Sequence, residues 1–136
     1  MGGYGACKLA LTYPERYGGC ISLSGAVDIT RKGRPYVLDE WRSLYGYQLE
    51  SALELEGSEH DVFMLAGRNK REGKPFPAMY LWCGLQDGLI HHNRQFHQHL
   101  EKLGVPHTYA ESEGDHTWPW WDLHIQDGLQ TVLSQM

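Results

Sequence analysis

The chain has 136 residues, of which 41% are hydrophobic and 21% are charged, and its formal net charge is -5. This length fits a single domain that buries roughly two thirds of the surface of its unfolded chain. A membrane protein is excluded because no apolar run reaches the about 18 residues of a membrane-spanning helix, and a nucleic-acid-binding protein is excluded because the Lys and Arg residues are scattered.

The chain opens on a glycine-rich segment, MGGYGACKLAL, in which a tight turn leads directly into a predicted helix. Apolar residues are dense from 4 to 12, as in a helix that is buried on most sides, and Pro14 ends it. The next apolar run is short and bounded by glycines. It predicts a buried strand at residues 20–24.

The second half of the chain alternates between predicted strands and predicted helices. Short apolar runs predict strands at 78–84 and 107–112, and apolar residues at helical spacing predict amphipathic helices at 89–103 and 118–134. Because strands and helices alternate, we expect an α/β fold with right-handed crossovers and about three parallel strands. The apolar positions of the two helices are Leu89, Phe96, Leu100 and Leu103 in the first, and Trp121, Ile125, Leu129 and Val132 in the second.

Residues 31–74 differ from the rest of the chain because their periodicity is weak and their charge is high. Helices are predicted there at 35–46 and 60–70, and we interpret the segment as a helical, cap-like insert in one domain that spans residues 1–136. A sheet of three parallel strands leaves both faces and both edges in need of cover. The sequence therefore predicts that this domain is only part of a larger one.

The cysteines and histidines give no metal-site pattern. Cys7, Cys20 and Cys83 lie in apolar runs without metal or disulfide spacing, so we expect them to be buried, which favours a reducing, cytoplasmic compartment. The histidines of HHNRQFHQH, residues 91–99, lack the i, i+4 spacing of a helical zinc site. We interpret them as a solvated or substrate-rim face and expect no metal.

Two polar residues follow neighbouring predicted strands: Asp87 comes after strand 78–84, and His116 comes after strand 107–112. Open α/β sheets bind ligands at the carboxyl ends of their strands, so these two side chains can meet above one sheet edge. Taken alone, Asp87 also fits the N-cap position of a helix, and His116 fits a solvated surface histidine. Thr117 is the expected N-cap residue of the last helix. Together they fit the acid and base of a nucleophilic triad.

The first residues of the chain indicate where a triad nucleophile belongs. In the motif Gly-x-Ser-x-Gly the serine occupies a strained turn from a strand into a helix. A serine directly before Met1 would make Gly2 the last glycine of that motif, and the helix from about Tyr4 would be the one that follows the turn. Ser22 and Ser24 lie in a predicted strand with no such turn after it, so no nucleophile is expected within the chain.

Four segments carry a resemblance to a known family: MGGYGACKLALTYPERY, GSEHDVFMLAGRNKREGKPFP, CGLQDGLIHHNRQFHQHLEKLGV and GDHTWPWWDLHIQDGL. They resemble, in the same order, the esterase D and tributyrin esterase branch of the α/β-hydrolases, which is related to feruloyl esterases. The resemblance covers essentially the whole chain. Members of the family read Ser-Met-Gly-Gly at the turn that carries the nucleophile, whereas this chain begins at the Met.

The resemblance implies a serine carboxylesterase for short-chain acyl or aryl esters, of which this chain is the C-terminal part. Asp87 would then be the triad acid, His116 the base and the backbone amide of Met1 one oxyanion-hole donor. The serine and an N-terminal segment of the same domain would lie outside the chain, which alone should be inactive, and no cofactor is implied. Trp118, beside His116, is expected to line the substrate pocket, and Trp121 fits either that pocket or the core.

The alternative function is a non-catalytic α/β module that binds a partner through an exposed sheet edge. A sheet edge with unpaired backbone groups is a ready template for pairing with a second chain. A homodimer is compatible with both functions. A serine-bearing segment upstream of Met1 would distinguish the esterase from the non-catalytic module.

Overall fold

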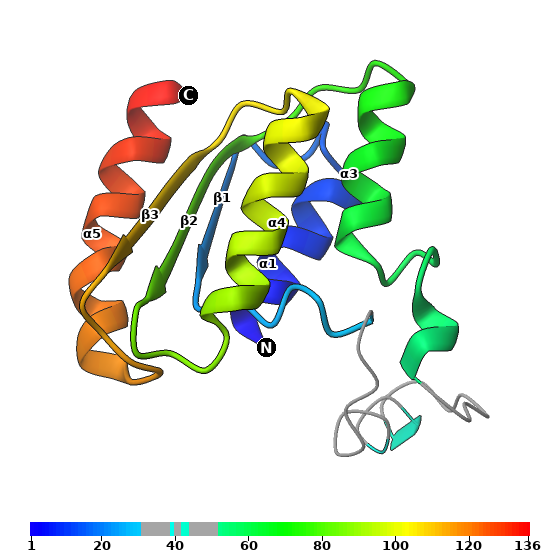
Figure 1. Ribbon diagram of the computed structural model, residues 1–136. Coiled ribbons are helices and arrows are strands. Elements are labelled where there is room, and N and C mark those ends of the chain that lie inside the picture. The colour runs from blue at the N-terminus through cyan, green and yellow to red at the C-terminus, as the bar shows by residue number, and fades with distance from the viewer. Residues whose placement is uncertain (31–38, 40–41, 44–51) are drawn as a thin grey trace.

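The computed structural model describes residues 1–30, 39, 42–43 and 52–136 (Figure 1). The helices and strands predicted from the sequence within these residues are present, each with bounds within two residues of the prediction. In chain order the elements are α1 (Gly2–Thr12), β1 (Gly19–Leu23), η1 (Ala52–Leu55), α3 (Val62–Arg71), β2 (Ala78–Gly84), α4 (Ile90–Leu103), β3 (Thr108–Ser112) and α5 (Trp118–Gln135).

The three strands form one parallel sheet in the order β1-β2-β3, which confirms the predicted α/β class. Gly19 pairs with Ala78 and Tyr80 pairs with Thr108, so β2 lies in the middle of the sheet. Because all strands run the same way, the loops that follow them emerge at one edge of the sheet (Figure 1). This shared edge brings residues that are distant in sequence close together.

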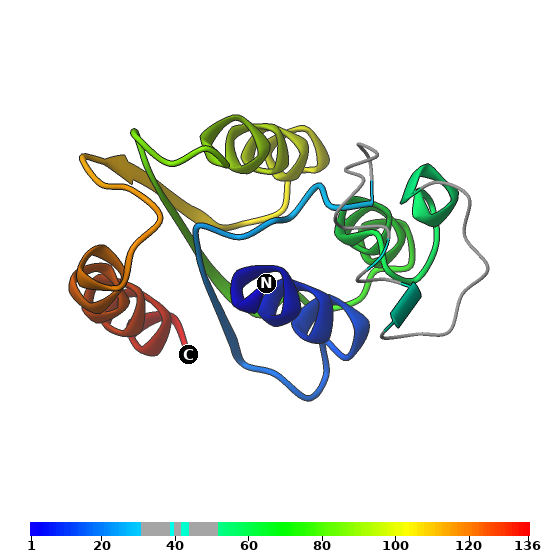
Figure 2. The same ribbon diagram turned by 90° about the horizontal axis from the view of Figure 1, so that it is seen from below.

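Helices cover both faces of the sheet. Helices α1 and α4 pack on one face, with α3 against both of them, and α5 packs on the other face against β1 and β2 (Figure 2). A parallel sheet needs this two-sided cover because its strands are apolar on both faces. In β2, for example, every residue after Ala78 is buried.

The larger part of the core lies between the sheet and helices α1, α3 and α4, and a smaller part lies under α5. Deleting a large apolar side chain from such a site costs about 2–5 kcal/mol, so these clusters supply much of the stability of the domain. Fully buried members of the larger cluster are Leu11, Leu65, Met79, Leu81, Phe96 and Leu100, and the smaller cluster contains Tyr80, Trp82 and Val132.

The second helix predicted in the insert is α3. It begins after Asp61, whose Oδ1 accepts hydrogen bonds from the backbone amides of Phe63 and Met64 at 3.0 and 3.4 Å, as an N-cap does. Its buried face packs against α1 and α4, so α3 is part of the helical layer of the domain. The first predicted helix, 35–46, lies largely outside the described residues.

Two sequence predictions are wrong in detail. Helix α1 begins at Gly2 rather than near Tyr4, because the amide of Gly5 already donates to the carbonyl of Met1 at 2.9 Å. Leu129 was expected in the buried stripe of α5 but is 47% exposed. The helix approaches the sheet through Gly128, where a Cβ atom would lie 2.8 Å from Ile21 Cγ2, and this contact turns Leu129 outward.

Candidate active site

Asp87 and His116 are in contact at the carboxyl edge of the sheet. Asp87 lies in the loop between β2 and α4, and His116 lies in the loop between β3 and α5. The distance from Asp87 Oδ2 to His116 Nδ1 is 2.9 Å. The Asp87 side chain is 1% exposed and that of His116 is 48% exposed, so a buried carboxylate holds an imidazole that solvent and substrate can reach.

The buried carboxylate of Asp87 has a second partner. Its Oδ1 accepts a hydrogen bond from the backbone amide of Leu89 at 2.9 Å, and Leu89 is the N-cap residue of α4. Asp87 therefore satisfies a free amide at the start of a helix and binds His116 with its other oxygen. The N-cap residue of α4 is Leu89 rather than Asp87, so the N-cap interpretation of Asp87 is wrong in detail, although Asp87 does accept an amide at the start of this helix.

The loop that carries His116 rests directly on the loop that carries Asp87. The amide of Gly114 donates to Gln86 Oε1 at 2.8 Å, and Gln86 N donates to the Gly114 carbonyl at 2.9 Å. A Cβ atom at Gly84 would lie 2.2 Å from that carbonyl oxygen, so the close approach requires glycine. Thr117 is the N-cap residue of α5 as expected, but its hydroxyl donates to Asp115 Oδ1 rather than capping the helix.

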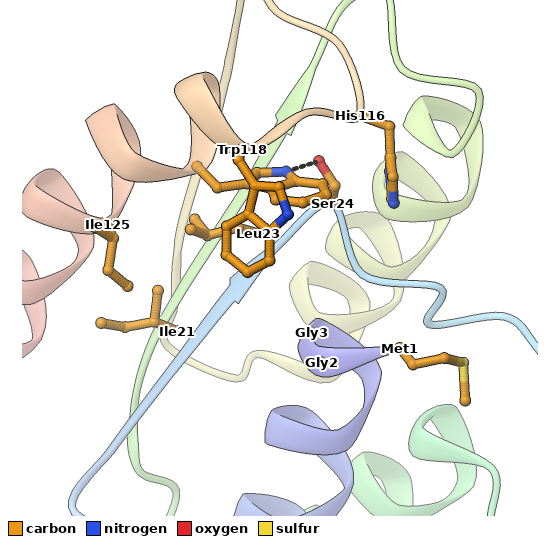
Figure 3. Close-up of a pocket in the computed structure, with 10 residues that line it drawn as sticks. Met1, Gly2, Gly3, Ile21, Leu23, Ser24, His116, Trp118 and Ile125 are labelled. Carbon is orange, nitrogen blue, oxygen red and sulfur yellow. Dashed lines mark hydrogen bonds between the residues drawn. The ribbon is translucent and has the colours of Figure 1, made fainter.

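A cavity of about 340 Å³ opens beside His116 (Figure 3). His116 and Met1 lie at one side of it, and Ile21 and Ile125 lie at the other. Apart from Ser24, the other side chains of the walls are apolar or aromatic, which suits an uncharged ligand. The described residues that line it are Met1, Gly2, Gly3, Ile21, Leu23, Ser24, His116, Trp118, Trp121 and Ile125.

The N-terminus of α1 forms one border of this cavity, because Met1, Gly2 and Gly3 are among its lining residues. A helix N-terminus presents unpaired backbone amides and a partial positive charge. The helix is seated closely, since a Cβ atom at Gly3 would lie 2.7 Å from the Cα of Gly25. The imidazole of His116 therefore faces the same cavity as the start of the glycine-rich helix.

The tryptophans after His116 differ in their surroundings. Trp118 is 78% exposed and lines the cavity, and its ring centroid lies 5.2 Å from that of Trp121. Trp121 also lines the cavity, while Trp120 packs against the cluster under α5. The expectation that Trp118 borders a pocket beside His116 agrees with this geometry, and Trp121 serves both the pocket and the packing of α5.

Sequence reasoning missed the conformation of Ser24. This residue comes directly after β1, has a left-handed φ of 52° and is 2% exposed. Its hydroxyl oxygen accepts a hydrogen bond from Trp121 Nε1 at 3.1 Å (Figure 3). The dipeptide Ser24-Gly25 after an apolar run is a turn signal that would have separated Ser24 from the strand.

The thiol of Cys83 lies close to the site. Burial, and after it the negative charge of the nearby Asp87 carboxylate, raises the pKa of Cys83 to about 12. A thiol with such a pKa stays protonated at neutral pH and is a poor nucleophile. All three cysteines are buried and free, as the sequence predicted.

A second Ser-His-Asp arrangement lies outside the cavity. Ser112 Oγ is 3.2 Å from His124 Nε2, and His124 Nδ1 is 3.1 Å from Asp127 Oδ2. The Ser112 hydroxyl also accepts a hydrogen bond from Trp82 Nε1 at 2.9 Å, and the His124 ring stacks on Trp82 with centroids 4.2 Å apart. None of these residues lines the cavity, and their contacts serve to satisfy the buried indole of Trp82.

The predicted solvated or substrate-rim face of histidines is present only in part: His91 of α4 is exposed, whereas the other three histidines of this helix contact protein groups. The imidazole of His92 contacts the buried carboxylate of Asp28, and His99 Nε2 lies 2.9 Å from the carbonyl oxygen of Phe63. His97 Nδ1 lies 2.7 Å from His107 Nε2. Within the described residues, no three His, Cys, Asp or Glu side chains come together as a metal site requires.

No helix in the part of the chain that the structure describes has both the length and the apolar character needed to cross a membrane.

Comparison with known proteins identifies the group to which the chain is similar. A family model described as "Putative esterase" matches residues 1–132. An acetyl esterase of Caldicellulosiruptor saccharolyticus is 32% identical over 134 residues, which is 96% of this chain and 50% of the relative.

Two solved structures from Staphylococcus aureus are similar in sequence and fold. An S-formylglutathione hydrolase is 25% identical with a TM-score of 0.76, and the fluorophosphonate-binding serine hydrolase F is 27% identical with a TM-score of 0.79. Each comparison covers 94% of this chain and 49% of the solved chain. The chain thus spans about half the length of the relatives it matches. Because the family model extends over nearly all of its residues, the chain belongs to this esterase family.

Proposed function

We propose that the chain is the C-terminal part of a serine carboxylesterase that hydrolyses short-chain acyl or aryl esters. The contact between Asp87 and His116, at the border of an apolar cavity, carries this proposal. It supplies two members of a hydrolytic triad in the order along the chain that α/β-hydrolases use. The similarity to an acetyl esterase and to two serine hydrolases supports the same activity.

His116 is the general base of the proposed reaction. With Nδ1–H donated to Asp87, the neutral imidazole keeps its lone pair on Nε2, which accepts the proton of a serine hydroxyl. The serine oxygen bonds to the ester carbonyl carbon, and Nε2 then protonates the departing alcohol as its C–O bond breaks. Water, deprotonated by the same nitrogen, releases the acid and restores the serine.

Asp87 keeps the imidazole in the productive tautomer and stabilises the imidazolium that forms during each proton transfer. Its burial suits this role because a desolvated carboxylate interacts more strongly with a neighbouring cation than an exposed one does. The amide of Leu89 fixes the carboxylate from its other oxygen, so the acid is held before substrate binds. The proposed chemistry requires no cofactor.

The serine nucleophile belongs, in this proposal, to a preceding segment of the same domain. Two observations support this placement. The chain spans half the length of its relatives. Ser24 is the only residue with a hydroxyl group among the described residues that line the cavity, and its hydroxyl oxygen already accepts a hydrogen bond from Trp121. A serine joined to Met1 would stand at the N-terminus of α1, beside the cavity. The amide of Met1 would then be one oxyanion-hole donor.

The apolar part of the cavity is the proposed site for the uncharged portion of the ester. Trp118 forms part of its wall at the solvent side, and Ile21 and Ile125 lie at the far side from His116 (Figure 3). A volume of about 340 Å³ suits a small acyl or aryl group. The alternative of a non-catalytic module is not favoured by the similarity to esterases, and a homodimer stays a prediction.

Fluorophosphonate labelling tests the proposal. The residues encoded before Met1 are determined first, and the chain is then produced alone and with that extension. We expect the extended protein to be labelled on the serine before Met1, and the chain alone to remain unlabelled. His116→Ala should lower the ester turnover of the extended protein by about 10⁶-fold.

Ser112→Ala serves as the control, because it removes the serine of the Ser112-His124-Asp127 arrangement outside the cavity and should leave labelling of the extended protein unchanged. The proposal is wrong if no serine precedes Met1, or if the His116→Ala protein retains full activity.

A further inference from the structure

Ser24 has a backbone conformation that side chains rarely adopt. Its φ of 52° is left-handed, and Ser24 is the only non-glycine residue among the described residues that has a positive φ. Non-glycine residues are strained in this region, and such residues cluster at functional sites. Ser24 stands at the carboxyl end of β1 and lines the cavity beside His116. We therefore expect a specific contact of Ser24 to offset the strain of its backbone.

That contact is the hydrogen bond from Trp121. The backbone amide of Ser24 donates to the carbonyl of Trp82 at 2.8 Å, which holds the residue against the sheet. From this position its hydroxyl oxygen accepts the indole N–H of Trp121 at 3.1 Å. The bond joins residues 97 positions apart in sequence, and thereby links the end of β1 to the first turn of α5.

The indole held by Ser24 is in turn in contact with the imidazole of His116. The two ring centroids lie 4.8 Å apart and the ring planes meet at 89°, an edge-to-face arrangement. Aromatic pairs of this geometry attract each other beyond the effect of their buried area. His116 needs this second contact because its side chain is 48% exposed, and a single hydrogen bond to Asp87 leaves the ring free to swing about that bond.

We infer that Ser24 and Trp121 are positioning residues that hold the His116 ring in the orientation in which Nε2 faces the cavity. Asp87 selects the tautomer, and the Trp121 indole, fixed by the Ser24 hydroxyl, limits rotation of the ring. The inference rests on the proposed function for its catalytic meaning. The restraint on the ring itself exists whether or not the protein is an esterase.

Three variants separate this role from the packing of α5. Trp121→Phe keeps an aromatic ring but removes the N–H donor, and Ser24→Gly removes the acceptor while accepting the left-handed φ. Trp120→Phe is the matched control, because Trp120 is on the same helix and packs against the same cluster as Trp121 but does not line the cavity. Circular dichroism and thermal unfolding of each chain show whether the fold is retained.

The first readout is nitrogen NMR of the His116 ring in the chain itself. We expect Trp121→Phe and Ser24→Gly to give averaged tautomer signals and increased ring motion, with the Trp120→Phe spectrum unchanged. In the extended esterase the same two variants should lower kcat about tenfold with KM little changed, as a misoriented base predicts. Asp87→Asn is the positive control for a disturbed tautomer.

Unchanged His116 signals and unchanged kcat in both folded variants would overturn the inference and leave the proposed function standing. Altered signals in a protein without esterase activity would contradict the proposed function but support the restraint. If Trp121→Phe fails to fold, Ser24→Gly alone decides, since glycine removes only a hydroxymethyl group and relieves backbone strain.

Discussion

Asp87 Oδ2 lies 2.9 Å from His116 Nδ1 although the two residues are 29 positions apart and belong to different loops. The contact exists because β2 and β3 are parallel neighbours, so the loops after them leave the sheet at the same edge. Gln86 and Gly114 then lock the two loops together through backbone and side-chain hydrogen bonds. The sheet topology, more than any local sequence feature, creates the candidate site.

Asp87 is predicted to have two separable roles. Asp87→Asn keeps an oxygen for the amide of Leu89 but no longer holds His116 in its tautomer, so stability should change little while kcat of the extended esterase falls by about 10⁴. Asp87→Ala also removes the acceptor for the Leu89 amide and should lower the free energy of unfolding by about 1 kcal/mol more. Urea denaturation and ester turnover measure the two effects. Equal unfolding free energies for both variants would contradict a stabilising role for the bond from the Leu89 amide.

Gly84 is predicted to be required for the placement of the His116 loop. In Gly84→Ala the new Cβ would meet the Gly114 carbonyl at 2.2 Å, so the loop must shift, and a loss of about 1–3 kcal/mol is expected. The NMR signals of the His116 ring should change as well. Gly88→Ala is the control, because nothing lies within 4 Å of its Cβ position. Identical stability and His116 signals in the two variants would show that the close approach is unimportant.

Gly3 and Gly5 are predicted to respond with opposite signs. In Gly3→Ala the added Cβ would lie 2.6 Å from Ser22 Oγ and 2.7 Å from Gly25 Cα, so α1 must move away from the sheet edge and stability should fall by about 1–3 kcal/mol. Gly5→Ala meets no atom within 4 Å and should raise helix stability by up to about 1 kcal/mol. Thermal unfolding distinguishes the two. A stabilising Gly3→Ala change would refute the close seating of α1.

The ion pair between Glu111 and Arg94 is predicted to stabilise the fold at neutral pH and to lose this effect in acid. Arg94 bonds both of its carboxylate oxygens, at 2.7 and 2.8 Å, and lowers the pKa of Glu111 from 4.5 to about 2. Because the pKa is lower in the folded state, the stabilisation is present above pH 4.5 and is lost as pH falls towards about 2. Glu111→Gln should cost about 1 kcal/mol at pH 7, where such a pair is partly screened by solvent.

The Glu111 prediction is checked by urea unfolding of both proteins between pH 7 and pH 3. The difference between wild type and Glu111→Gln should shrink below pH 4.5. Glu113→Gln is the control, because Glu113 is exposed and has no ion pair with the described residues. A difference that stays constant over this range would exclude the charge of Glu111 as its cause.

Much of this architecture is readable from local sequence. Apolar runs and helical spacing located the three strands and the helices, because a strand buried on both faces leaves a continuous apolar run and a helix buried on one face leaves a period of about 3.6. The positions of Asp87 and His116 after successive strands were enough to predict that they meet. The resemblance to esterases, carried by four segments, indicated the family to which the chain belongs.

The details within the site were decided by tertiary contacts. The left-handed Ser24, its bond to Trp121 and the edge-on contact of that indole with His116 join three distant segments, so no local period encodes them. Leu129 shows the same limit, because its spacing fits the buried stripe while the close approach at Gly128 turns it outward. Sequence determined which residues are available at each element, whereas packing of the elements decided which of them touch, since contact depends on helix rotation and sheet register.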